Sequence, residues 1–177
     1  MNRPFKDQLV ETLPALRAYA RSLTGDLADA DDLVQETMMK ALASASRFED
    51  GSNMRAWLFT ILRNTRNSQF RKRAREVEDV DGEHAEKQSA PGRPEATLEM
   101  QELEAALSRL PEDQREAVML IGASGLDYSE ASAIVGVSVD ALKARVSRGR
   151  KKLAALLDPS PRLSPPPLRR DASTAHA

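Results

Sequence analysis

The sequence predicts an all-α protein: two small helical domains joined by a flexible linker. Apolar residues recur at helical spacing through most of the chain, which favours amphipathic helices. No alternating run of Val, Ile and Tyr bounded by hairpin turns is present, so strands are not expected. Because aromatic residues make up only 4% of the 177 residues, each core should be aliphatic and small.

Composition divides the chain into four segments. Apolar periodicity runs through residues 1–75, fades over 76–98 and returns over 99–157. Segment 76–98 is acidic and contains two prolines and two glycines, which is typical of a flexible linker. Residues 158–177 contain five of the ten prolines and should form a disordered tail. We therefore expect domains at 1–75 and 99–157.

The first domain opens with two helical segments. Phe5, Leu9 and Leu13 share one face of a short helix. A second helix should begin near Pro14, because proline suits the first turn of a helix. It should end at Gly25, because glycine readily adopts the left-handed conformation that stops a helix.

Two longer helices complete the first domain. The Asp side chains at the start of DLADADDLVQETMMKALASASRF favour a helix N-terminus. The next helix follows EDGSN, with Ser52 or Asn53 as its N-cap. Its buried face should carry four residues: Trp57, Leu58, Ile61 and Leu62. Its far end, RNTRNSQFRKRAR, is strongly basic.

The second domain contains the pattern of a helix-turn-helix, YSEASAIVGVSVDALKARVSRGRKKL. Ser129 should cap its first helix, Gly136 should form the sharp turn, and Ser138 should cap the second helix. The second helix should turn its basic residues outward: Lys143, Arg145, Arg148 and Arg150. In such folds this helix enters the major groove of DNA.

Charge is strongly segregated, although the formal net charge is only −1. Residues 61–75 carry six basic and no acidic side chains, and so do residues 142–153. Residues 76–104 between them carry two basic and ten acidic side chains. An ordinary solvated helix face, the alternative reading, usually mixes both signs. The pattern therefore predicts two contact sites on one polyanion, which we take to be DNA.

Two patterns point to more specific contacts. The basic run at 61–75 also contains amides and Phe70, which suits unstacked bases as well as phosphates, although a basic helix end can also serve solubility. In DADDLVQETMMKA, four residues lie along one exposed face at helical spacing: Asp32, Gln35, Glu36 and Met39. An acidic face with an exposed methionine suits a protein groove, and it is equally compatible with ordinary solvent-facing polarity.

Several classes of protein are not expected. The absence of Cys excludes disulfides and thiolate metal sites, and His84 and His176 lie in polar, loop-like sequence, so neither metal nor cofactor is predicted. No nucleophile–base pair or phosphate-binding loop points to an enzyme. The N-terminus lacks a signal peptide and no run of about 18 apolar residues is present, so we expect a soluble cytoplasmic protein.

Three motifs together resemble bacterial extracytoplasmic-function (ECF) sigma factors over residues 10–157. The first motif, DADDLVQETMMKAL, resembles sigma region 2.2. The second motif, FEDGSNMRAWLFTILRNTRNSQFRKRAR, resembles regions 2.3 and 2.4. The third motif, LSRLPEDQREAVMLIGASGLDYSEASAIVGVSVDALKARVSRGRKKL, resembles region 4. The resemblance implies a non-enzymatic protein that binds the β′ clamp helices and β flap of core RNA polymerase. It also implies recognition of minus-35 and minus-10 promoter elements.

Finer details are most similar to the general-stress-response (EcfG-like) group, notably LTGDLADADDLVQETMMKA and FRKRAREVE. This similarity implies a NepR-type anti-sigma factor and a PhyR-type response regulator that sequesters it. The rival interpretation is a stand-alone helix-turn-helix regulator, which leaves the DDLVQE face unexplained. The sequence leaves open the promoter sequence and whether the two domains are apart or packed together.

The family resemblance also assigns roles to individual residues. The implied polymerase contacts are Asp32, Gln35, Glu36 and Met39. The implied minus-10 contacts are Asn53 and Met54, in a loop that captures a flipped base, and Arg63, Asn64, Asn67 and Arg71 on the helix after it. The implied minus-35 contacts are Lys143, Ala144 and Arg148 in the groove, with Ser138 and Arg145 on phosphates.

Overall fold

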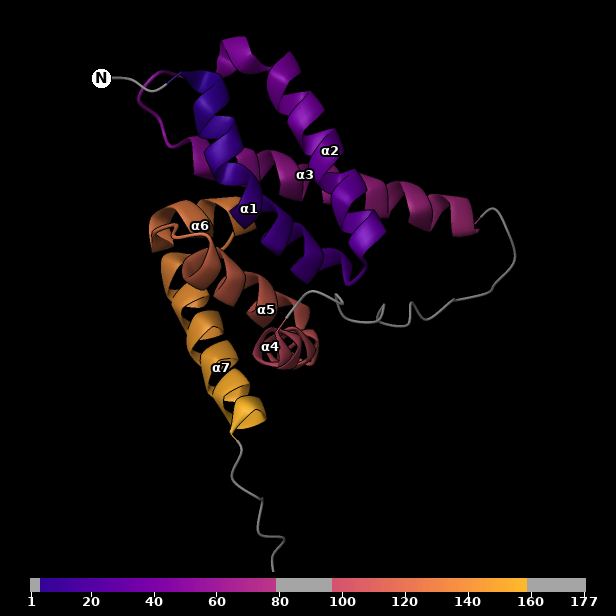
Figure 1. Cartoon of the computed structure of the whole chain (residues 1–177), viewed down its shortest axis with the longest axis vertical. Coiled ribbons are helices and arrows are strands. Elements are labelled where there is room, and N and C mark those ends of the chain that lie inside the picture. Colours follow the sequence, from indigo (N-terminus) through magenta and orange to yellow (C-terminus); the bar gives the residue numbers. More distant parts are fainter. Residues whose placement is uncertain (1–3, 79–96, 159–177) are drawn as a thin grey trace, which may run out of the picture.

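The computed structural model describes residues 4–78 and 97–158, and both parts are helical (Figure 1). The N-terminal part contains α1 (Phe5–Thr24), α2 (Leu27–Ala43), η1 (Ala45–Arg47) and α3 (Met54–Glu78). The C-terminal part contains α4 (Leu98–Ser108), α5 (Glu112–Val118), η2 (Met119–Ala123), α6 (Tyr128–Val135) and α7 (Val139–Leu157). The predicted all-α class is confirmed. Most of the predicted linker and tail lies outside the described residues, so the domain division stays a prediction.

Helix α1 is continuous through Pro14, so the predicted break before this residue is wrong. Proline has no N–H to donate to the carbonyl of Val10, but both residues are exposed and water can solvate that carbonyl. The opposite face of α1 buries Leu16 and Tyr19 completely, and this packing holds the helix together across the proline. The predicted end at Gly25 is confirmed, with a φ of 70°.

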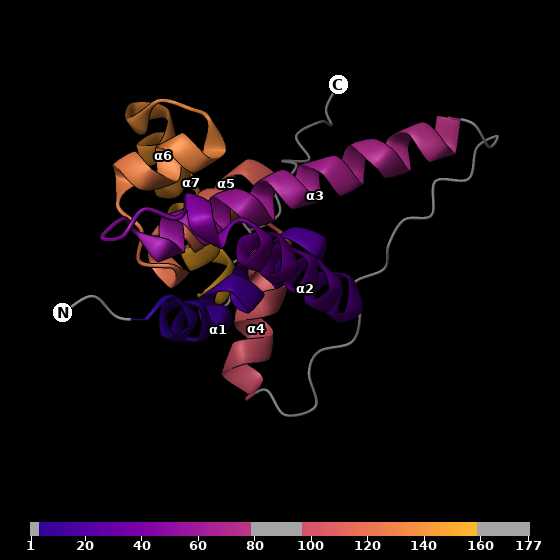
Figure 2. The same ribbon diagram turned by 90° about the horizontal axis from the view of Figure 1, so that it is seen from above.

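Helix α3 buries more of its surface than its sequence predicts. Leu58 and Leu62 are fully buried as expected, whereas Trp57 is only half-buried. Phe59 is also fully buried, and its ring stacks on that of Tyr19 with centroids 4.9 Å apart. The start of α3 therefore packs on more than one side, and only its distal half extends beyond the body of the molecule (Figures 1 and 2).

Local capping residues set the geometry of the helix-turn-helix. Asp127, not the predicted Ser129, caps α6, because it forms a reciprocal capping box with Glu130 three residues later. The predicted turn at Gly136 is confirmed, with a φ of 76°. The predicted cap at Ser138 is also confirmed, since its hydroxyl accepts a hydrogen bond from the third residue of the helix.

The N-terminal and C-terminal parts pack against each other. The start of α3 meets α6, while α1 lies beside α4, α5 and η2 (Figure 1). Buried residues of both parts belong to one core cluster, including Leu16 and Phe59 from the first and Ala117 and Leu120 from the second. This contact answers the question of domain arrangement that the sequence leaves open.

The approach of α7 to α5 depends on Gly149. A Cβ added there would lie 2.7 Å from Val118 Cγ2 and 3.1 Å from the carbonyl oxygen of Gln114. Replacing glycine by alanine favours an isolated helix by about 1 kcal/mol, but overpacking costs about 1–3 kcal/mol. We expect Gly149→Ala to lower the free energy of unfolding by about 1 kcal/mol in urea titrations.

The matched control is Gly122→Ala, because no atom lies within 4 Å of the added Cβ at that glycine. The control should leave the free energy of unfolding unchanged or raise it slightly. Stabilisation by Gly149→Ala equal to that of the control would contradict the close packing of α7 on α5.

Candidate nucleic-acid and protein interfaces

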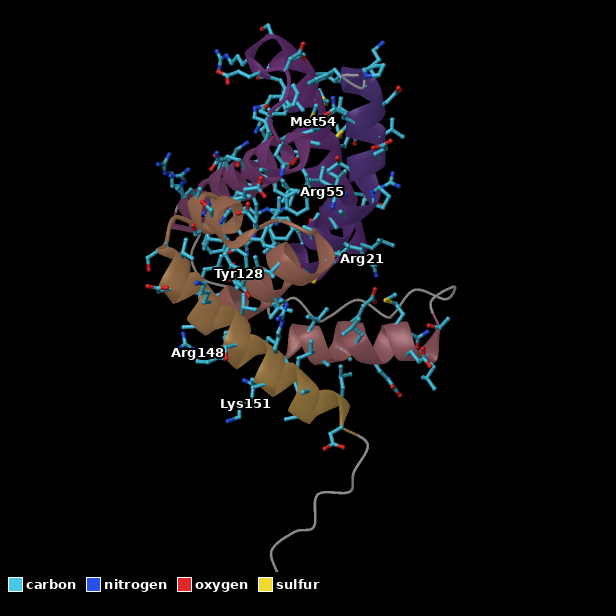
Figure 3. All side chains as sticks on the ribbon, turned by 90° about the vertical axis from the view of Figure 1, so that its left-hand side faces the viewer. Arg21, Met54, Arg55, Tyr128, Arg148 and Lys151 are labelled. Carbon is cyan, nitrogen blue, oxygen red and sulfur yellow. The ribbon has the colours of Figure 1, made fainter. Side chains whose placement is uncertain are left out.

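The outer face of α7 is cationic. Its buried face carries Leu142 and Val146, which are at most 2% exposed and anchor the helix on the domain. The exposed basic residues are Lys143, Arg148, Arg150, Lys151 and Lys152. In Figure 3, Arg148 and Lys151 lie on the side of α7 that faces away from the other helices. A helix with this charge on its free side is suited to an anionic partner.

The predicted minus-35 residues differ in how available their side chains are for contact with DNA. Lys143 is exposed, and its ammonium lies 6.0 Å from the ring centroid of Tyr128, a cation–π distance that holds it over the start of α6. Ala144 is half-buried, and the hydroxyl of Ser138 is engaged in capping α7.

Arg145 does not point fully outward as predicted. Its Nε lies 3.5 Å from Asp113 Oδ2 of α5, and 26% of its side chain is exposed. Position 145 follows the buried Leu142 by three residues, so it lies at the edge of the packed face of α7. A phosphate contact by Arg145 would therefore compete with Asp113.

The projecting half of α3 presents amide, guanidinium and aromatic groups to solvent. Arg71 is exposed, Phe70 is 68% exposed, and Asn67, near the start of this half, is half-buried. Asn64 is also exposed, but it lies on the inner half of the helix. Amides suit base edges, and an exposed ring gives an unpaired base a surface on which to stack. This end of α3 has the chemistry that a single nucleic-acid strand requires.

The inner half of α3 meets carboxylates of α5. Arg63 Nε lies 2.9 Å from Glu116 Oε1, and Arg66 Nη1 lies 2.6 Å from Glu112 Oε1. The same oxygen of Glu116 accepts a 2.8 Å hydrogen bond from the Tyr19 hydroxyl. Burial, and after it the neighbouring carboxylate, raises the pKa of Tyr19 well above its ordinary value, so the phenol remains a donor.

The loop before α3 also contacts the C-terminal part. Asn53 caps α3 through Oδ1, and its Nδ2 donates a 2.6 Å hydrogen bond to Glu130 Oε1. Arg55 Nη1 donates to the carbonyl oxygen of Ser124 at 2.6 Å. Met54, an implied base contact, is only 4% exposed and packs into the core (Figure 3). Its side chain is therefore not available to a base in this arrangement.

Helix α2 offers a separate acidic face. Three of the predicted residues on it are exposed: Asp32, Gln35 and Met39. Glu36 is instead half-buried, because Gln69 of α3 donates to its Oε2 at 2.6 Å and Lys40 Nζ lies 2.6 Å from its Oε1. The hydrogen bond from Lys40, together with that from Gln69, lowers the pKa of Glu36. Glu36 is thus charged but already engaged within the chain.

Two arginines at the interface between the parts were not among the predicted contacts. Arg66 follows Arg63 by three residues, so helical spacing alone places it on the same side of α3. Arg55 has no comparable local signal, because its partner Ser124 lies 69 residues away in the sequence.

Within residues 4–78 and 97–158, no helix is long and apolar enough to cross a membrane. The same residues contain no cluster of three His, Asp or Glu side chains that could hold a metal ion. His84 and His176 lie outside the described residues.

Two known sequence families match the chain, one in each of its two parts. Residues 9–76 match the family described as Sigma-70 region 2, and residues 100–153 match Sigma-70, region 4. The ECF RNA polymerase sigma factor EcfG of Rhodopseudomonas palustris is 54% identical over 153 residues, covering 86% of this chain and 84% of that protein.

Solved structures agree with these matches. The sigma factor RpoE of Bartonella quintana, solved with the anti-sigma factor NepR, is 51% identical and superposes with a TM-score of 0.76 over 86% of this chain and 96% of its own. CnrH, solved with the cytosolic domain of CnrY, is 31% identical with a TM-score of 0.62 over 87% of each chain. The chain therefore belongs to the ECF RNA polymerase sigma factors, with α1–α3 forming its region 2 and α4–α7 its region 4.

Proposed function

We propose that this alternative sigma factor divides transcription initiation among three helix faces. Helix α2 binds core RNA polymerase, α3 holds the melted minus-10 element, and α7 reads the minus-35 element. The protein catalyses no reaction itself. It acts in the cytoplasm, where the polymerase catalyses RNA synthesis. The observation that carries this proposal is the contrast between the acidic, methionine-bearing face of α2 and the cationic faces of α3 and α7.

The chemistry of each face suits its target. Helix α7 can read duplex DNA directly, where each well-placed base contact contributes about 1–3 kcal/mol of discrimination. Extruding a base from the duplex costs a few kcal/mol. Stacking on an aromatic ring such as that of Phe70 contributes a favourable free energy of about 1–3 kcal/mol per base, which offsets the cost of extrusion.

The proposal extends to the general stress response and to regulation by an anti-sigma factor. The resemblance to EcfG and to a sigma factor solved with NepR supports a NepR-type inhibitor for this chain. A PhyR-type response regulator would then release the sigma factor by sequestering that inhibitor. Co-purification of a small protein with the tagged chain from unstressed cells, lost under stress, tests this part.

Run-off transcription with purified core polymerase and a promoter library tests the central function. We expect RNA from a defined subset of promoters, and only when the chain is added. Binding of the chain to DNA without initiation on any promoter would favour a stand-alone helix-turn-helix regulator instead.

A further inference from the structure

Three aromatic side chains of region 2 meet at one corner of the N-terminal part. Phe5 is the first residue of α1, Phe48 directly follows η1, and Trp57 lies in the first turn of α3. The ring centroid of Phe5 lies 5.6 Å from that of Phe48 and 6.1 Å from that of Trp57. The centroids of Phe48 and Trp57 lie 5.2 Å apart. Each ring therefore meets both of the others, and we call these three residues the aromatic clasp.

The rings of the clasp are arranged as attractive pairs. Aromatic rings favour edge-to-face and offset arrangements with centroids about 4.5–7 Å apart. The three pairs have interplanar angles of 61°, 67° and 54°, so none is a parallel sandwich. All three side chains are half-buried and pack against the core cluster. The clasp thus has a defined geometry and is anchored on the body of the molecule.

The clasp holds the two ends of an exposed loop, residues 49–53. Phe48 precedes this loop and Trp57 follows it, while all five loop residues are exposed. The loop folds back at Ser52, whose N–H and hydroxyl both donate to the carbonyl oxygen of Glu49, at 3.0 and 2.7 Å. The start of α1, with Phe5, lies beside the segment that joins α2 to α3 (Figure 1). Phe5 therefore connects the two ends of the loop.

Polar contacts do not replace the rings in this role. Within the described parts of the chain, the loop side chains hydrogen-bond inside the loop, to the start of α3 and, through Asn53, to Glu130 of region 4. No hydrogen bond or ion pair between described residues joins the loop to α1, so the clasp supplies that link. Phe5 also lies outside residues 9–76, which match Sigma-70 region 2. The family match therefore assigns no role to Phe5.

We propose that Phe5 is a positioning residue for the minus-10 step, because it acts through Phe48 and Trp57 to hold the loop 49–53 in the shape that receives an extruded base. This inference rests on the proposed function, in which region 2 holds the melted minus-10 element and this loop captures its flipped base. A loop that is ordered in advance binds more tightly, since ordering it on binding would cost affinity. All three rings belong to region 2, so the clasp does not require contact with region 4.

Trp57 reports on the clasp, because it is the only tryptophan of the chain. Phe5→Ala removes two of the three ring contacts. It should shift the fluorescence emission of the free chain to longer wavelength, since water then reaches the indole. The matched control, Val10→Ala, truncates a side chain of the same helix that is 63% exposed, and it should leave the emission unchanged. Unchanged emission in Phe5→Ala would overturn the clasp.

The role in base capture is tested in the holoenzyme. Run-off RNA is measured on promoters that carry one abasic site, placed in turn at each non-template position of the minus-10 element. For the wild type we expect losses of roughly fivefold or more at the positions whose bases are bound. Phe5→Ala should abolish the loss at one position, that of the captured base, and preserve the losses elsewhere. A reduction of RNA on all promoters alike, with every ratio preserved, would show a merely structural role and overturn the proposal.

Two further variants separate the ring from the fold. Phe5→Leu keeps an apolar side chain at the start of α1 but has no ring, so it should keep the wild-type unfolding midpoint and show the same position-specific change. Phe5→Tyr keeps the ring and should restore the wild-type emission and ratios. Wild-type ratios at every position in Phe5→Leu would overturn the positioning role. A wild type that initiates on no promoter would instead contradict the proposed function.

Discussion

Asp32→Arg should weaken binding to core RNA polymerase by roughly 30-fold or more, since a disrupted charged contact at the centre of an interface costs about 2–5 kcal/mol. Asp32 is exposed on α2 beside the acidic and methionine side chains that give this face its character. Reversal of its charge puts a cation where the polymerase should present a basic or neutral surface. Titration of labelled core with the variant measures the loss.

Asp31→Arg is the matched control for charge. It makes the same change one residue earlier, about 100° around the helix, at a position that is also exposed. We expect this control to keep most of the affinity for core and an unfolding midpoint equal to that of Asp32→Arg. An equal loss in both variants would show that net charge, not this face of α2, governs the affinity.

Lys143→Ala and Arg148→Ala should each reduce initiation that depends on the minus-35 element by roughly 5- to 150-fold, the equivalent of one to three kcal/mol per base contact. Both side chains are exposed on the free side of α7. Affinity for core polymerase should not change, because the proposed polymerase-contact residues are all on α2, whereas Lys143 and Arg148 are on α7. Run-off transcription on promoters with an intact and a scrambled minus-35 element separates the two effects.

Lys152→Ala removes the same charge nine residues beyond Lys143. It should weaken binding to both promoters alike, since a phosphate contact carries no sequence information. If Lys143→Ala and Arg148→Ala also act equally on both promoters, α7 supplies charge without reading bases.

Features decided by neighbouring residues were predictable from the sequence. Gly136 and Ser138 form the expected turn and cap because both depend on a few adjacent backbone groups. The same reasoning fails at Ser129 only because Asp127 and Glu130 form a stronger reciprocal cap. The family itself was also predictable, since its three motifs follow one another in order, and the comparisons confirm it.

Features decided by distant residues were not predictable. Glu36 fits the exposed face of α2 by periodicity, but Gln69 of α3 reaches it from 33 residues away. The engagement of Arg63 by Glu116 joins residues 53 apart, and no local pattern indicates it. Helical spacing identifies which side chains share a face, whereas tertiary packing decides whether that face is free.

The central claim is that separate faces of one chain bind polymerase and promoter. Run-off transcription measured against rising core concentration, at a fixed and subsaturating promoter concentration, tests it most directly. We expect Asp32→Arg to shift the midpoint to higher core concentration and still reach the wild-type plateau, and Arg148→Ala to keep the midpoint and lower the plateau. A lower plateau for Asp32→Arg, or a shifted midpoint for Arg148→Ala, would contradict this division of roles.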